Sequence, residues 1–395
     1  MKQVIDEGIK KPQMFMGEVN LTHKDCEKAI EFILKKIDQN LGTFGLKYPA
    51  PASVNHIYPA IENIEWTSSF WTGLLWLAYE VTGEVKYRKL AELQLEDYQK
   101  RINHRICTDT HDLGFLYTLS CVAAYRLTGN EAARETALKA ADLLMERYFE
   151  KAGIIQAWGD LNDPENRGRM IIDCCMNLPL LYWATEMTGH QKYYDAAVNH
   201  VNQAMKHIIR EDASSYHTYY MDVATGEPKF GKTAQGYSDD SCWARGQAWG
   251  IYGFVLSYRY TRDWKMIEMA QKLTHYYLNR LPDDAICYWD LIFTAGNEER
   301  DSSTAAIAAC GLLEMSKHLP QTDQSKRMYE NAALKMVMSL INNYTTVSIP
   351  SSNGILLHAV YSKPAGDGVD ECNLWGDYFY FEALVRLIKD WELYW

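Results

Sequence analysis

Apolar residues along the chain follow two helical patterns, one that leaves a polar face and one that does not. In one type of segment, Ala137, Ala140, Ala141, Leu144 and Met145 recur at helical spacing, and charged residues occupy the opposite face, as in an amphipathic helix. Other segments, including WTSSFWTGLLWLAY, LGFLYTLSCVAAY and CMNLPLLYWA, are apolar nearly all round. A helix without a polar face is buried on every side. The pattern therefore predicts buried inner helices that alternate with amphipathic outer ones.

The ends of these helices are marked by a recurring Thr-Gly pair. Three helical segments end at Gly83, Gly129 and Gly189, and a fourth ends at Thr261 without the glycine. Glycine can adopt the left-handed conformation that closes a helix C-terminus. Inner helices are expected to begin near Trp66, Asp112, Asp173, Trp243, Asp301 and Trp375. Outer helices are expected to begin near Lys24, Val85, Glu131, Gln191, Trp264 and Gln324.

Six helix pairs predict an all-α fold, a six-hairpin toroid or (α/α)6 barrel, formed by a single domain over residues 1–395. An open solenoid of helical repeats is the alternative, but the uneven spacing of the inner helices favours a closed ring with long loops. Three polar loops, 160–170, 211–241 and 345–374, lie directly before inner helices. Binding residues are expected in such loops at one rim of the scaffold.

Composition and charge narrow the possible partners. Hydrophobic residues make up 47% and charged residues 23%, as in an ordinary globular protein. The net charge of −11 argues against binding to a nucleic-acid backbone, and no apolar run is long enough to span a membrane. The first fifteen residues contain no apolar core of a secretory signal, so a cytoplasmic location is expected. Aromatic residues reach 13%, which hints at a sugar ligand because Trp and Tyr can stack on sugar rings.

Cysteines and known motifs offer no sign of a cofactor. The nine cysteines include no C-x-x-C pair, so buried free thiols are expected rather than disulfides or a zinc site. We find no glycine-rich phosphate loop, no H-E-x-x-H and no G-x-S-x-G. Asp239 and Asp240 are a weak metal signal and fit a loop turn better. The sequence therefore predicts no metal and no cofactor.

Acidic residues at the starts of inner helices are the main catalytic candidates. Asp112, Asp173, Asp301 and Asp377 each open such a helix. Any one of them can be a helix cap, but several carboxylates that converge on one aromatic pocket suggest a functional pair. Asp112 and Asp173 are the best candidates. Each is followed at once by an apolar helix, where burial can raise the pKa of a carboxyl group and make it a general acid.

Other polar and aromatic residues in these segments can each have a structural role or a substrate-binding role. Arg245 can form a structural ion pair with an aspartate at the rim, or bind a substrate carboxylate with two hydrogen bonds. His217 and Gln235 can be loop-packing or turn residues, or they can bind substrate. Trp66, Trp158 and Trp249 can be core residues or a platform for a sugar ring.

Several long motifs resemble one enzyme family. The segments EWTSSFWTGLLWLAYE, HDLGFLY, GIIQAWGD, DCCMNLPLLYWA, QGYSDDSCWARGQAWG, YWDLIF, RDSSTAAIAACGL and LWGDYFYFEAL occur in order from about residue 45 to the C-terminus. They are similar to the unsaturated glucuronyl hydrolases, in particular to those of Firmicutes. The resemblance implies an (α/α)6 barrel and activity on the unsaturated disaccharides that lyases release from glycosaminoglycans such as hyaluronan and chondroitin.

The resemblance also implies a mechanism and a set of site residues. The reaction is hydration of the C4=C5 vinyl ether, with Asp173 as the acid that protonates C4 and then as base. Asp112 would hold sugar hydroxyls and stabilise charge. The remaining positions that match the family's sugar site are Trp66, Trp158, His217, Gln235, Arg245 and Trp249.

One loop departs from the family pattern. Members that favour sulfated disaccharides carry a Ser-x-x-Ser-x-Lys element, and this chain has Ser362 but Ala365 and Asp367 in place of the second Ser and the Lys. Lys363 could substitute in part. The sequence therefore predicts a weaker or altered preference for sulfate.

Two other functions remain open, a related hydrolase of unsaturated rhamnogalacturonan products and a sugar-binding barrel without catalytic activity. The DCCMNLPLL and CWARGQAW segments favour the glucuronyl hydrolases over the first alternative. Intact Asp112 and Asp173 argue against the second.

Overall fold

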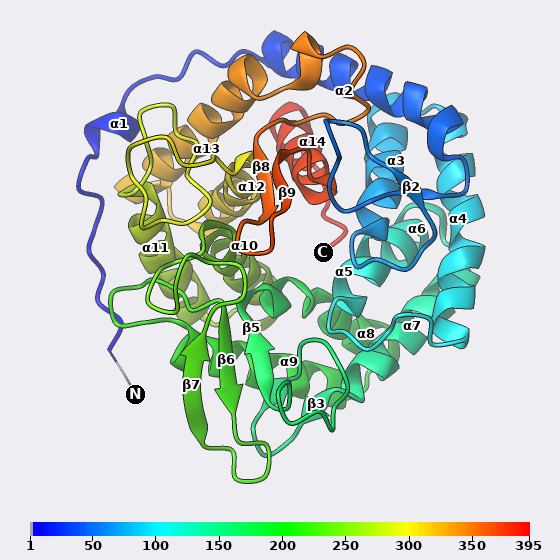
Figure 1. The fold of residues 1–395 in the computed structure, drawn as a ribbon, viewed down its shortest axis with the longest axis vertical. Coiled ribbons are helices and arrows are strands. Elements are labelled where there is room, and N and C mark those ends of the chain that lie inside the picture. Colours follow the sequence, from blue (N-terminus) through cyan, green and yellow to red (C-terminus); the bar gives the residue numbers. More distant parts are fainter. Residues whose placement is uncertain (1–2) are drawn as a thin grey trace.

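The computed structural model describes residues 3–395, and Figure 1 shows two layers of helices around a common centre. The inner layer contains α3 (Ser68–Thr82), α5 (Leu113–Tyr117) continued by η1 (Thr118–Val122) and α6 (Ala123–Thr128), η2 (Ile172–Met176) followed by α8 (Pro179–Thr188), α10 (Ala244–Thr261), α12 (Ser302–His318) and α14 (Leu374–Ile388). The outer layer contains α2 (His23–Phe44), α4 (Val85–Asn103), α7 (Glu131–Met145), α9 (Gln191–Gln203) with η3 (Ala204–Ile208), α11 (Trp264–Leu278) and α13 (Gln324–Asn343). Short helices α1 (Gln13–Met16) and η4 (Thr346–Ser348) lie outside this pattern.

This arrangement confirms the predicted (α/α)6 barrel. Within residues 3–395, every inner and outer helix begins within two residues of its expected start. The inner helices are buried on all sides, as their composition requires. Gly83, Gly129 and Gly189 close three helices in the left-handed conformation, with φ of 72°, 69° and 72°, and Arg262 takes the same role after Thr261 with φ of 56°.

Short antiparallel strands organise the loops at one end of the barrel. They are β1 (Tyr48–Pro49) with β2 (Ala60–Ile61), β3 (Tyr148–Phe149) with β4 (Ile154–Ile155), the sheet of β5 (Arg169–Ile171), β6 (Thr218–Met221) and β7 (Pro228–Lys232), and β8 (Ala359–Ser362) with β9 (Asp367–Glu371). The segments that the sequence indicated only as long polar loops thus contain β5 to β9. Their backbone groups pair with one another, which satisfies hydrogen bonds in segments that are partly buried. The register aligns Ile171 with Thr218 and Ser362 with Asp367.

Inside the ring, the core carries a buried charged network. Arg386 donates to Glu314 at 2.8 Å and to Glu382 at 3.0 Å. Glu382 also accepts a hydrogen bond from the indole of Trp395 at 2.9 Å. Trp395 stacks on Phe379 at 5.9 Å, and the C-terminus lies near the centre of the ring in Figure 1. Each buried charge therefore has a partner, without which its desolvation would be strongly destabilising.

The cysteines and the helix lengths bear on two further predictions. All nine cysteines are free, and all except Cys107 are buried, which confirms the prediction of buried thiols. No helix within residues 3–395 is both long enough and apolar enough to cross a bilayer. Residues 1 and 2, which belong to the N-terminal stretch considered for a secretory signal, lie outside the described residues.

The close approach of α5 to the segment after η2 depends on Gly114. A Cβ at this position would lie 2.3 Å from the Cα of Asn177, well inside van der Waals contact. The inner-helix start that carries Asp112 and the segment that carries Asp173 can therefore pack together only because residue 114 has no side chain.

We expect Gly114→Ala to lower the free energy of unfolding by roughly 1–3 kcal/mol, because backbone must shift to accommodate the methyl group. Gly42→Ala is the matched control, since Gly42 lies within helix α2 and a Cβ there would meet nothing within 4 Å. The control should be neutral or stabilise by up to about 1 kcal/mol. Thermal or urea unfolding of the two variants tests this, and equal effects would contradict the packing argument.

Candidate active site

Two largely buried carboxylates from different inner helices meet at the strand-bearing end of the barrel. Asp112 is at the N-cap position of α5, and Asp173 is in the first turn of η2. Neither side chain caps its helix. Asp112 instead accepts a hydrogen bond from the hydroxyl of Thr110 at its Oδ2, with a distance of 2.7 Å. The capping alternative therefore does not account for these two residues.

His111 bridges the two carboxylates. Its Nε2 lies 3.5 Å from Oδ1 of Asp112 and 3.4 Å from Oδ1 of Asp173. The imidazole is fully buried, and the backbone N–H of His111 donates to the carbonyl of Ala157 at 3.0 Å. The three side chains thus form one compact cluster. We refer to Asp112 and Asp173 as the acid pair.

Burial controls the protonation of this cluster. It raises the pKa of Asp112 to about 6, although hydrogen bonds from Thr110 and Asn177 and the charges of Arg147 and Arg101 act in the opposite direction. The pKa of Asp173 is raised well above its usual value by burial and then by the nearby charge of Asp112. Because the charge of Asp112 raises the pKa of Asp173, Asp112 loses its proton first and Asp173 is the member of the pair that retains a proton.

The histidines of the site stay uncharged. Burial lowers the pKa of His111 to about 3, and the charge of Arg147 acts in the same direction. Burial also lowers the pKa of His217 to about 3, with contributions from Arg245 and Arg169. Both imidazoles are therefore neutral at physiological pH and act as hydrogen-bonding groups rather than as cations.

Two buried arginines connect the outer layer to the acid pair. Arg101 of α4 donates hydrogen bonds to Asn63 and to carbonyls of the segments that lead into Trp66 and Asp112, at Ile64, Glu65, Ile106 and Cys107. Arg147 donates to the carbonyls of Gln156, Ala157 and Gly159, which flank Trp158. These guanidinium groups fix the loops and also supply the positive potential that favours ionised Asp112.

Asn177 is a further support for the pair. Its Oδ1 accepts a hydrogen bond from the backbone N–H of Phe115 at 2.7 Å, so its amide nitrogen points away from Phe115. The amide lowers the pKa of Asp112, so it favours the ionised carboxylate. Asn177 follows Asp173 by four residues, and it links the two helix starts directly.

The other two aspartates at helix starts have structural partners. Asp301 caps α12 through Ser303 and pairs with Arg245 at 3.1 Å. Asp377 accepts hydrogen bonds from the backbone of Ile355 and Leu356 and from the hydroxyl of Tyr58. Capping and loop anchoring therefore describe these two residues.

Arg245 is largely occupied by the protein. Its guanidinium donates to Asp301, to Gln235 at 2.7 Å, to the carbonyl of Tyr361 at 2.7 Å and to the carbonyl of Val360. The rings of Trp243 and Trp375 lie on it at 4.5 and 4.8 Å. Four of its five N–H donors are used, which favours the structural ion pair, and its role as a clamp for a substrate carboxylate stays a prediction.

Trp66 and Trp158 lie near the start of α5 and remain partly exposed. Trp66 stacks on Trp375 at 5.2 Å and donates from its indole to the hydroxyl of Tyr361 at 3.0 Å. Trp158 precedes Gly159, whose N–H donates to the carbonyl of Asp109, so this loop runs beside the start of α5. Trp249 differs, because its ring is 1% exposed and packs on Phe115 and Phe379, as a core residue does.

His217 and Gln235 lie together on the β6–β7 side. The Nδ1 of His217 accepts hydrogen bonds from the backbone N–H groups of Ala234 and Gln235, at 2.8 and 3.2 Å. A neutral ring that accepts at Nδ1 carries its proton on Nε2, and this Nε2 is buried without a hydrogen-bond partner among the described residues. Gln235 accepts from Arg245 through Oε1, so the arginine fixes its amide.

Sequence reasoning missed three residues of the site, namely His111, Asn177 and Arg169. Arg169 of β5 lies between the rings of Trp158 and Tyr220 at 4.9 and 5.2 Å. Its Nε donates a hydrogen bond to the hydroxyl of Tyr220 at 2.7 Å, and no ion pair joins it to a carboxylate in the part of the chain that the structure describes. His111 could have been found as the neighbour of Asp112, whereas the other two depend on contacts between distant elements.

The acid pair and His111 are also the group most able to hold a metal ion in residues 3–395. One ligand atom from each of the three side chains lies within 4.8 Å of the others. The donor set of one imidazole and two carboxylates would suit a divalent metal ion. The sequence prediction of no metal stays a prediction.

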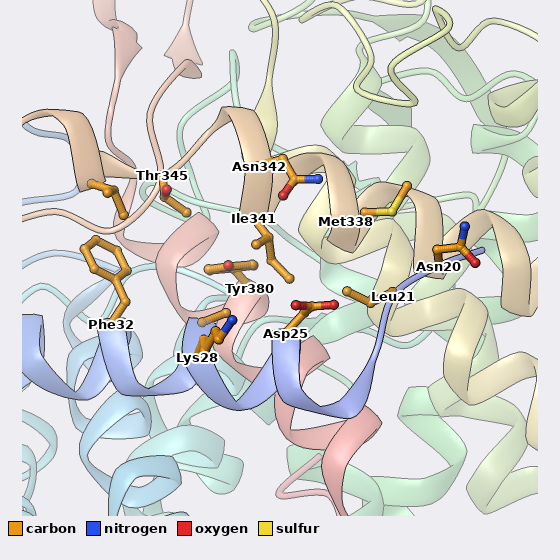
Figure 2. Close-up of a pocket in the computed structure, with 12 residues that line it drawn as sticks. Asn20, Leu21, Asp25, Lys28, Phe32, Met338, Ile341, Asn342, Thr345 and Tyr380 are labelled. Atoms are coloured by element: carbon orange, nitrogen blue, oxygen red, sulfur yellow. The ribbon is translucent and has the colours of Figure 1, made fainter.

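Elsewhere on the surface, Figure 2 shows a cavity of about 380 Å³ between α2 and α13. Leu21, Phe32 and Ile341 line it together with polar residues. Its carboxylate, Asp25, is already used in the capping box of α2 with Thr22. This cavity therefore offers no second carboxyl group with which Asp25 could form a pair like that of Asp112 and Asp173.

The chain is similar to known proteins over nearly its whole length. The model of Glycosyl Hydrolase Family 88 matches residues 38–387. The unsaturated chondroitin disaccharide hydrolase of Streptococcus agalactiae serotype III (strain NEM316) is 50% identical over 100% of this chain and 99% of that protein. The unsaturated glucuronyl hydrolase of Bacillus sp. (strain GL1) is 41% identical over 93% of this chain and 98% of that protein.

A solved structure is similar over the full length as well. The crystal structure of unsaturated glucuronyl hydrolase from S. agalactiae has a TM-score of 0.97 and 50% identity, and the match covers 100% of both chains. Similarity at this level extends to both layers of the barrel and to the loops at its rim.

Proposed function

The chain belongs to Glycosyl Hydrolase Family 88, and on this premise we propose that it releases 4,5-unsaturated uronic acid from lyase-generated glycosaminoglycan disaccharides. The chain is a glycosidase, and its motifs and relatives are those of the unsaturated glucuronyl hydrolases. The observation that carries the substrate and the mechanism is the acid pair, whose two carboxyl groups both lie within 3.5 Å of His111 and in which burial and the charge of Asp112 raise the pKa of Asp173.

The chemistry of a vinyl ether matches this arrangement. Protonation of a carbon atom requires an acid that is still neutral at working pH, and Asp173 supplies one. Transfer of its proton to C4 forms the C4–H bond and leaves positive charge on C5 and the ring oxygen. Water then adds to C5 and gives up a proton to Asp173, which restores the acid. The hemiketal that results opens and releases the second sugar without attack at C1.

Asp112 has a separate role in this scheme. Its negative charge lies next to the developing positive charge of the sugar, where an ionised group is stabilising. Its Oδ2 is oriented by Thr110, and Asn177 and the two arginines favour its ionised state. Asp112 therefore stabilises charge and holds sugar hydroxyls, while Asp173 transfers the proton.

The groups around the pair suit a planar, anionic sugar. Trp66 and Trp158 offer partly exposed rings on which an unsaturated ring can stack. The Nε2–H of His217 is a buried donor without a protein partner among the described residues, and Arg169 is a cation beside Trp158. These two groups complement the uronate carboxylate, together with Arg245 through its remaining N–H and with Gln235.

The β8–β9 hairpin determines how strongly a sulfate group on the second sugar binds. Ser362 is 8% exposed and pairs across the hairpin with exposed Asp367. Lys363 forms an ion pair with Glu299, so its charge is already partly neutralised. An S. agalactiae unsaturated glucuronyl hydrolase variant has been crystallised with dGlcA-GalNAc6S; the negative charge of Asp367 argues for weaker binding of such a sulfated sugar in this chain.

The role of Asp173 is tested by Asp173→Asn, which keeps the shape of the side chain but removes the transferable proton. We expect turnover, followed as loss of the ultraviolet absorbance of the unsaturated uronide, to fall by about 10²–10⁴-fold while substrate binding persists. Asp109→Asn is the control, because Asp109 is an exposed carboxylate three residues before Asp112, and it should keep wild-type turnover. Undiminished turnover by Asp173→Asn would exclude the mechanism, and binding without turnover by the wild type would indicate a sugar-binding barrel.

The pH profile tests the division of labour within the pair. Activity needs Asp112 ionised and Asp173 protonated, so kcat/KM should fall on the acid side around the pKa of Asp112, about 6, and on the alkaline side at the higher pKa of Asp173. Asp112→Asn removes the charge that raises the pKa of Asp173. The alkaline limb of its residual activity should therefore move to lower pH, and an unmoved limb would contradict the assignment.

Sulfate preference is tested with two substrates, the unsaturated disaccharides of hyaluronan and of 6-sulfated chondroitin. The wild type should show at most a weak preference for the sulfated sugar. The double variant Ala365→Ser, Asp367→Lys should raise relative kcat/KM for the sulfated sugar by about tenfold, since a repulsive charge becomes an attractive one. The rate on the hyaluronan product serves as the internal control. A strong preference for the sulfated sugar in the wild type would refute the prediction.

A further inference from the structure

His111 occupies a position that the proposed reaction does not yet explain. Its ring is fully buried, and neither ring nitrogen forms a hydrogen bond of ordinary geometry with a described residue. Nevertheless, Nε2 faces one oxygen of each carboxyl group, at 3.5 Å for Asp112 and 3.4 Å for Asp173. Two oxygens that converge on one nitrogen require a proton on the nitrogen or on one of the oxygens, since lone pairs facing each other repel, and either the imidazole or the protonated Asp173 can supply it.

We propose that His111 is a positioning residue whose neutral ring carries its proton on Nε2 and shares it between Oδ1 of Asp112 and Oδ1 of Asp173, so that the catalytic proton of Asp173 is confined to Oδ2. The proposal rests on the function proposed above and concerns the same site. The two distances are those of one hydrogen shared by two acceptors rather than of two full bonds.

The alternative tautomer is disfavoured by the same contacts. With the proton on Nδ1, the ring would bury an N–H donor that has no acceptor among the described residues. The lone pair of Nε2 would also face ionised Asp112, and it could be satisfied only if Asp173 placed its proton on the buried Oδ1. With the proton on Nε2, the only unsatisfied atom is an acceptor, and buried donors without partners are the rarer case in proteins.

The exposure of Asp173 shows why the choice of oxygen matters. Its Oδ1 is completely buried, although the side chain as a whole is 18% exposed. The accessible oxygen is therefore Oδ2. A proton on Oδ1 would point into the protein toward His111, where no substrate can reach it. Occupation of Oδ1 by the Nε2–H leaves Oδ2 as the oxygen from which a proton can pass to C4.

The hydrogen bonds of Asp112 fit its ionised state in the same scheme. Its Oδ2 accepts from Thr110 at 2.7 Å, and its Oδ1 accepts from His111. A carboxylate with a donor at each oxygen is stabilised in the charged form. His111 thus acts on both members of the pair: it stabilises the charge on Asp112 and directs the proton on Asp173.

Other charged and titratable groups around the cluster are held constant by the rest of the fold. Arg101 and Arg147 act on Asp112, and Arg245 acts on Asp173. The remaining groups near the three side chains are His200 of α9, His217 beside β6, Cys174 and Cys175 of η2, and Tyr361 of β8. Because the two histidines stay neutral and burial raises the pKa of both thiols and of Tyr361, none of these groups changes charge in the pH range of the test.

Two substitutions of His111 separate a shared proton from simple packing. The amide nitrogen of Gln can reach the place of Nε2, whereas that of Asn reaches only the place of Nδ1. We expect His111→Gln to keep kcat within about tenfold of wild type and His111→Asn to lower kcat by about 10²–10³-fold, with KM changed by less than about threefold. His200→Asn is the control, since Asn can still accept the hydrogen bond that His200 Nδ1 receives from Ile155.

The pH profile supplies a readout that a packing role would not move. In His111→Asn, ionised Asp112 loses a donor, so the acid limb of kcat/KM should shift to higher pH, while His111→Gln and His200→Asn should keep the wild-type limb. Equal losses of kcat in both His111 variants, or an acid limb that does not move, would overturn the proposal.

A direct measurement on the wild-type protein does not depend on any variant being active. Long-range ¹H–¹⁵N correlation spectra of protein labelled at its 11 histidines distinguish the two neutral tautomers and the cation, and His111→Gln assigns the signal. We expect the Nε2–H tautomer throughout pH 5 to 8; an Nδ1–H or charged ring would refute the proposal. Absence of turnover of unsaturated uronides by the wild type would instead refute the proposed function and leave the tautomer result unaffected.

Discussion

Two carboxyl groups share one desolvated site at the rim of the barrel, where the charge of Asp112 raises the pKa of Asp173. In a low dielectric, both cannot ionise at once without a large electrostatic cost. Thr110, His111 and Asn177 contact or adjoin Asp112, while Asp173 has the proton donor of His111 as its near neighbour. The unequal surroundings separate the two pKa values, and this separation turns a costly arrangement into an acid and its charged partner.

The double ring of helices is what brings these groups together. Asp112 and Asp173 are far apart in sequence, and each is carried by the start of an inner helix that is buried on all sides. Gly114 allows the two starts to touch. Outer helices contribute as well, since Arg101 of α4 fixes the backbone segments that lead into Trp66 and Asp112. The outer layer therefore acts on the site through buried guanidinium groups.

Arg245 shows how one residue can serve the scaffold and the site together. It pairs with Asp301, holds the amide of Gln235 and binds two carbonyls of the β8 strand. Its main effect is to connect α10, α12 and the rim hairpin. The cation with the fewest protein partners at the site is Arg169, which only the pairing of β5 with β6 brings beside His217.

The sequence by itself determined the helices, their alternation and the two aspartates, because the periodicity of apolar residues and Thr-Gly helix ends are local signals. It also indicated Trp66, Trp158, His217 and Gln235 through motifs that resemble a known family. Only the tertiary structure decided which aspartates cap helices and which form the pair, that Arg245 is largely used by the protein, and that His111, Asn177 and Arg169 belong to the site. Protonation, burial and hydrogen bonding depend on neighbours from other helices, and no pattern along a single segment contains them.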